Sequence, residues 1–134
     1  MKKLVFMMFF LFCNLYASAS FAACARADLT GTWRIYLDHD SGAMRCTLVM
    51  PASGTAISSS SYCYIPGVSN SSPLSGSLSL DLTNCRVFGS LRRASGSSNN
   101  IDAWISKGKD SIAGMWWNPS APSTDAGFFS GVKQ

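Results

Sequence analysis

The sequence contains few of the residues that catalysis needs. It has no glutamate, a single histidine at position 39, and only 13% charged residues. General acid–base and nucleophilic catalysis both require positioned titratable side chains, and no nucleophile-elbow motif accompanies the histidine. The cluster Asp38-His39-Asp40 lies in a predicted turn, where aspartate side chains commonly cap backbone amides. We therefore expect no catalytic site and no enzyme.

The cysteines lack the spacing of a metal site. No C-x-x-C pair occurs in the sequence, and the lone histidine offers no second imidazole. Zinc sites are usually built from closely spaced cysteine and histidine ligands. We therefore expect neither a metal nor a cofactor.

Residues 1–22 differ in composition from the rest of the chain. Lys2 and Lys3 precede an apolar run over residues 4–12, and small residues occupy most of positions 17–22. This order is typical of a secretory signal peptide, which predicts cleavage after Ala22 and one domain over residues 23–134. The apolar run is shorter than the ~20 residues that span a bilayer, so we expect no membrane span in the mature chain. A lipoprotein anchored at Cys24 is the alternative.

The mature chain would carry little net charge. The formal charge is +4 for the whole sequence, and it falls to +2 when the two lysines of the leader are removed. Such a small excess argues against nucleic acid or an anionic membrane surface as the partner. We expect a periplasmic or secreted protein.

The mature chain keeps an even number of cysteines, which in a small exported protein indicates two disulfides. If residues 54–55 formed the tip of a hairpin, Cys46 would lie directly opposite Cys63. Cys24 would then pair with Cys85 by elimination. Other pairings remain open, because a different tip would shift the register.

Turn-forming clusters recur along the mature chain at short intervals and predict eight short strands between them. The segments between the clusters alternate apolar and polar residues, as half-buried strands do. Closing eight sequential strands into an antiparallel up-and-down β-barrel would remove the exposed edges. A β-sandwich is the alternative. The predicted breaks are at residues 38–42, 51–54, 66–73, 83–84, 94–99, 108–109 and 118–125.

The two ends of the mature chain resemble the calycin barrels. This group contains lipocalins, fatty-acid-binding proteins, avidins and bacterial barrel inhibitors of secreted metalloproteases. In it a Gly-x-Trp opens the first strand, as Gly31 and Trp33 do here, and a basic residue near the end of the last strand packs across the Trp, as Lys133 could. The resemblance implies that Trp33 plugs the closed end of the barrel and that the Lys133 cation lies over the indole face. All three residues would be structural.

Four aromatic residues are candidates for ligand contact near the mouth of the barrel: Tyr64, Trp104, Trp116 and Trp117. Aromatic side chains commonly grip small apolar or sugar-like ligands. We therefore expect an exported binding protein of the bacterial envelope that holds a small ligand or a partner protein at its loop-bearing end. An inhibitor of a secreted protease, which would need a projecting arm over residues 23–28, and an envelope structural protein are the alternatives.

Overall fold

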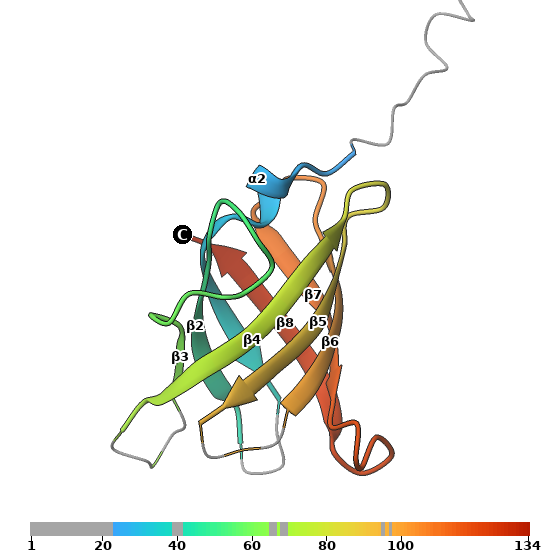
Figure 1. The fold of residues 1–134 in the computed structure, drawn as a ribbon. Helices are drawn as coiled ribbons and strands as arrows, with labels where there is room; N and C mark the ends of the chain where they lie inside the picture. Colours follow the sequence, from blue (N-terminus) through green and yellow to red (C-terminus); the bar gives the residue numbers. More distant parts are fainter. Residues whose placement is uncertain (1–22, 39–41, 65–66, 68–69, 95, 97) are drawn as a thin grey trace, which may run out of the picture.

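The protein folds as a closed barrel of eight antiparallel strands that follow one another in chain order (Figure 1). The computed structural model describes residues 23–38, 42–64, 67, 70–94, 96 and 98–134. The expected barrel is thus confirmed over the sandwich. The expected signal peptide and the histidine of the 38–40 cluster lie outside the described residues. The strands are β1 (Gly31–Leu37), β2 (Met44–Met50), β3 (Tyr62–Tyr64), β4 (Ser72–Asp81), β5 (Arg86–Arg93), β6 (Ser98–Ile105), β7 (Ser111–Trp117) and β8 (Ala126–Lys133).

Alternation along the strands fills the barrel interior. In β1 the side chains of Trp33 and Ile35 are buried while Tyr36 is exposed, and in β2 Cys46 and Leu48 face the same core. Because successive strand residues point to opposite faces, each strand supplies every second side chain to the interior. Within the described residues no helix is long and apolar enough to span a membrane.

Both expected disulfides are present. Cys46 on β2 lies in register with Cys63 on β3 and is bonded to it, and Cys24 is bonded to Cys85. A sulfur atom in a disulfide cannot also form the thioether that attaches a lipid. The alternative of a lipoprotein anchored at Cys24 is therefore wrong for this oxidised form of the protein.

The segment that joins β2 to β3 is longer than the two-residue hairpin that the register argument assumed. Residues 51–61 leave the β2–β3 ladder and run beside β4, where the amide of Ile57 donates to the carbonyl oxygen of Gly76 at 3.0 Å. The amide of Leu78 donates to the carbonyl oxygen of Thr55 at 2.8 Å. The predicted register of the two cysteines is confirmed. The predicted two-residue hairpin at residues 54–55 is wrong, because residues 55–57 form their hydrogen bonds with β4 and not with each other.

A short helix, α2 (Arg26–Leu29), closes one end of the barrel. Leu29 and Trp33 are completely buried there, and the indole Nε1 of Trp33 donates to the carbonyl oxygen of Leu29 at 2.8 Å. Lys133 Nζ lies 5.7 Å from the centroid of the Trp33 ring. The backbone of Gly31 has a φ of +116°, which favours glycine. The expected packing of Lys133 on Trp33 is confirmed.

Candidate functional site

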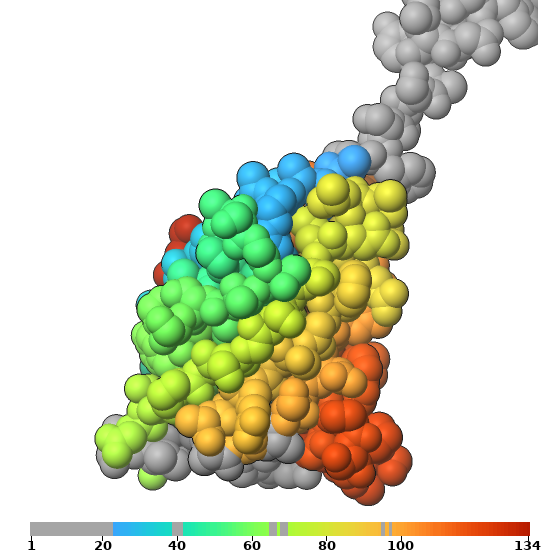
Figure 2. Space-filling model, viewed as in Figure 1, coloured from blue at the N-terminus to red at the C-terminus, as the bar shows by residue number. Residues whose placement is uncertain are grey.

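The N-terminal segment is bound to the closed end rather than projecting from it. Besides the Cys24–Cys85 disulfide, Lys109 Nζ donates to Asp28 Oδ2 at 2.5 Å and to the carbonyl oxygen of Ala23 at 3.1 Å. This lysine is the main reason that the pKa of Asp28 is below its ordinary value. Figure 2 shows the N-terminal segment beside the β4–β5 turn at this end. Residues 23–28 thus do not form the free arm that a protease inhibitor of the calycin type would need.

The barrel interior is nearly filled. A cavity within it measures about 30 Å³, which suffices for one or two water molecules, since a single water needs about 10–15 Å³. Most of its lining is apolar, with Arg93 and Asn99 among the lining residues, and Asn99 Oδ1 is buried without a hydrogen-bond partner. This cavity therefore has no room for a ligand the size of a sugar ring.

The four candidate aromatic residues do not gather at one place. Trp116 is buried in the core, where its Nε1 donates to the carbonyl oxygen of Asp38 at 2.9 Å. Tyr64 on β3 and Trp104 on β6 are 38% and 49% exposed, and Trp117 is half-buried at the end of β7. The barrel order separates β3 from β6 by two strands on one side and four on the other. These residues cannot surround a single ligand inside the barrel.

The outer wall instead carries a group of large apolar side chains on β1, β6, β7 and β8. Phe128 is 70% exposed, and four others are about half exposed: Tyr36, Trp104, Met115 and Val132. Met115 and Phe128 are direct cross-strand neighbours. Outward positions of a strand in a water-soluble barrel are usually polar, so this wall departs from the expected pattern.

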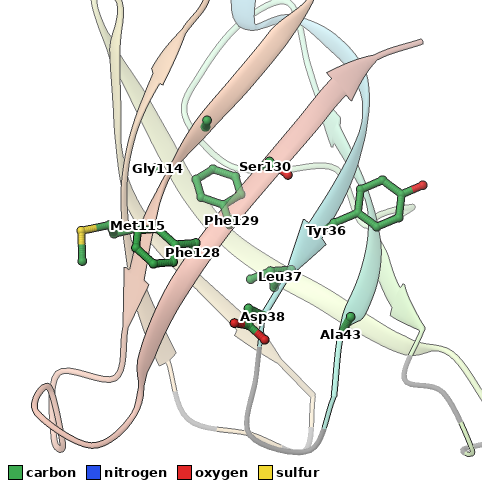
Figure 3. A pocket seen from close by; sticks show the side chains of 10 residues that line it. Tyr36, Leu37, Asp38, Ala43, Gly114, Met115, Phe128, Phe129 and Ser130 are labelled. Carbon is green, nitrogen blue, oxygen red and sulfur yellow. The ribbon is translucent and has the colours of Figure 1, made fainter.

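Small residues separate these large ones and hollow the wall. Ala113 on β7 pairs with Ser130 on β8, and the neighbours beyond them are Trp104 on β6 and Tyr36 on β1. Two hollows of about 700 and 470 Å³ share Tyr36, Ala113 and Ser130 in their linings and open to the outside. Figure 3 shows Tyr36 on one side of the larger hollow and Met115 and Phe128 on the other. We call this surface the saddle: Tyr36, Trp104, Ala113, Met115, Phe128, Ser130 and Val132.

An ion pair between Arg86 and Asp102 lies beside Trp104 on one side of the saddle. Arg86 lies opposite Trp104 in the ladder, and its guanidinium is 5.9 Å from the Trp104 ring centroid and 5.6 Å from that of Phe88. Two of its nitrogens donate to Asp102 Oδ1 and Oδ2 at 2.7 and 2.8 Å. This contact lowers the pKa of Asp102 and keeps the carboxylate ionised. The exposed indole is therefore pre-oriented by a fixed neighbour.

The Tyr36 side of the saddle carries two arginines. Arg45 lies opposite Tyr36 and stacks over the Tyr64 ring at 5.4 Å from its centroid. Arg34 donates from Nη1 to Thr47 Oγ1 at 2.9 Å. Hydrogen bonds to Thr47 and Arg34 lower the pKa of Tyr62, which lies beside them on the same wall. This side therefore combines exposed aromatic rings with cationic groups.

The saddle residues are aromatic, aliphatic or small. Within the described residues, no group of three or more histidine, cysteine or acidic side chains could hold a metal ion. No protein-family model matches the chain, and no curated protein matches it. The resemblance to calycin barrels thus stays a prediction from the residues at the two chain ends. What the arrangement offers is an apolar contact surface with polar and charged borders.

The sequence contained one signal for the saddle that the candidate residues missed. In β8 both faces carry large apolar side chains, because Phe128 and Val132 point outward while Phe129 is buried. Tyr36 occupies the outward face of β1, where a polar residue would serve as well. Apolar residues at the positions opposite the core face would have indicated a contact surface on the outer wall.

Proposed function

We propose that this chain is an exported, non-enzymatic binding protein of the bacterial envelope that holds a partner protein in the saddle. The observation that carries this proposal is the continuous apolar wall around Ala113 and Ser130, exposed on four strands of the barrel. Exposed apolar surfaces of this kind on soluble domains commonly mark interaction sites. Trp104 and Tyr36 belong to the residue types that contribute most to binding at interfaces.

A partner protein fits the geometry better than a small ligand. Small-molecule pockets bury most of the ligand surface, whereas both hollows of the saddle open to solvent. The interior cavity is too small for the apolar or sugar-like ligand that the sequence suggested. The site of the proposed function is therefore the outer wall of the barrel, from the hollow beside Asp38 to the hollow beside Ser106 and Ser111, rather than its loop-bearing end.

The two disulfides are consistent with an oxidising compartment. Together with the leader-like composition of residues 1–22, they support a periplasmic or secreted location. A partner would then be another exported protein or the exposed part of an envelope protein.

Site-specific photo-crosslinking in cells that export the protein tests this proposal. A benzophenone amino acid placed at Met115 should give discrete protein adducts, and the same group at Ser75, on β4 across the barrel, should give none. Ala113→Arg, which fills the floor of the saddle, should abolish the Met115 adducts, whereas Ser75→Arg should leave them unchanged. Circular dichroism would check that both variants fold.

Equal labelling from the two positions would contradict the proposal. So would Met115 adducts that persist in a folded Ala113→Arg protein. A partner that contacts Met115 without entering the floor of the saddle would give that second result, because Ala113 lies on the outer face between Ser130 and Trp104.

A further inference from the structure

We propose that the partner is a polypeptide segment that presents carboxylates beside its apolar residues, and that these carboxylates meet Arg34 and Arg45. This inference rests on the proposed function and adds the chemistry of the partner. It starts from the unequal distribution of charge on the two sides of the saddle.

The two arginines lie immediately beside residues of the saddle. Arg34 on β1 is the direct cross-strand neighbour of Val132 on β8, and Arg45 on β2 is the direct neighbour of Tyr36 on β1. Outward residues that face each other across two strands are about 5 Å apart at Cβ. A group that touches Val132 or Tyr36 is therefore within reach of a guanidinium.

Charge is compensated on one side of the saddle and uncompensated on the other. Arg86, next to Trp104, is neutralised by its two-point contact with Asp102. In the part of the chain that the structure describes, neither Arg34 nor Arg45 forms an ion pair with a carboxylate. Asp38 lines the larger hollow toward the loop-bearing end.

Both arginines are oriented by neutral groups that leave their charge available. Arg34 donates to Thr47 Oγ1 and to Gln134 Oε1 and also hydrogen-bonds the Tyr62 hydroxyl, and Arg45 stacks on the Tyr64 ring. A guanidinium has five N–H donors in a rigid plane, so Arg34 keeps some of its donors for a further acceptor and the stacked Arg45 keeps most of them. A carboxylate can accept two of these donors side by side, which makes it the best-matched protein group.

The shape of the saddle favours a protruding polypeptide segment over a flat surface such as a membrane. Trp104 and Tyr36 stand on strands separated by three interstrand spacings, which places them about 14 Å apart. The floor between them is formed by Ala113 and Ser130. This gap matches the 10–12 Å or so across an α-helix with its side chains. A bilayer surface would rest on the walls and leave the floor empty.

Selection from a phage-displayed library of short random peptides tests the inference, with the purified, disulfide-bonded protein as bait and its Ala113→Arg variant for counter-selection. We expect the surviving peptides to combine aromatic or aliphatic residues with two or more aspartates or glutamates. Arg45→Glu should weaken a synthesised survivor about tenfold or more, since like charges at an interface border are strongly disfavoured. Arg92→Glu, the same change on the exposed outer side of β5, should leave its affinity unchanged.

The outcomes separate this inference from the proposed function. Neutral or basic survivors that still require the open floor would overturn the acidic partner and leave the saddle as the binding site. Counter-selection on Ala113→Arg that removes every peptide selected on the unchanged protein would overturn both, because such peptides would bind without the open floor. A separate experiment measures binding to phosphatidylglycerol vesicles. Vesicle binding that persists in the Ala113→Arg variant would overturn the polypeptide partner and indicate a membrane surface in its place.

Discussion

Replacing Lys133 with methionine should destabilise the closed end of the barrel. Its Nζ donates to the carbonyl oxygens of Ala27 and Asp28 at 2.9 and 3.0 Å, at the end of helix α2, and lies over Trp33. Hydrogen bonds to a charged group contribute about 1.5–3 kcal/mol each, and an exposed cation–π contact about 0.5–1 kcal/mol. Methionine keeps the apolar stem, and partial exposure reduces the sum, so we expect a loss of about 2–3 kcal/mol.

Urea unfolding followed by far-UV circular dichroism and tryptophan fluorescence measures this loss in the free energy of unfolding. Lys107→Met is the matched control, because Lys107 is exposed in the β6–β7 turn and should change stability by less than about 0.5 kcal/mol. Lys133→Arg, which keeps the cation, should restore most of the stability. A Lys133→Met protein as stable as the Lys107→Met control would refute the role assigned to this lysine.

Three further changes have expected outcomes. Removing both Cys24 and Cys85, whose disulfide spans 61 residues, should lower the free energy of unfolding by about 4 kcal/mol in the chain-entropy treatment. Removing the β2–β3 disulfide, which spans 17 residues, should lower it by about 3 kcal/mol, and urea unfolding without reductant compares the two variants. The Asp28 carboxylate has a lowered pKa, so its contribution to stability is present above its ordinary pKa of 3.8 and is lost as the pH falls through the lowered pKa; Asp28→Asn should flatten this acid side of a stability–pH curve. Gly76→Ala should cost more than about 3 kcal/mol in thermal or urea unfolding, because its φ is +135° and a Cβ would lie 2.1 Å from a backbone oxygen of β5.

The barrel could be predicted from the sequence because its determinants are local. Alternation places Trp33 and Ile35 on one face of their strand, and turn-forming clusters mark where each strand ends. Disulfide pairing followed from the same register, since Cys46 and Cys63 sit on neighbouring strands. The course of residues 51–61 could not be predicted, because it depends on hydrogen bonds to β4, a strand that comes later in the chain.

The saddle depends on relations between strands that no single segment contains. Alternation alone indicates that Tyr36 and Trp104 point outward, as both do. It does not indicate that Ala113 and Ser130 lie between them, because that arrangement is set by the registers of three separate strand pairs. A shift of one residue in any of these pairs would place a different side chain on the floor. The aromatic candidates were therefore chosen by residue type, and the small residues were overlooked.

Closure of the barrel also limits how a partner can bind. β1 pairs with both β2 and β8, so the described barrel offers no free strand edge to which a partner could add a strand. Recognition on its wall must then come from side chains, and the side chains on the floor of the saddle must be small for a partner to reach it. This is why Ala113→Arg is the most informative variant: Ala113 is outside the core, and its change should affect binding while leaving the fold intact.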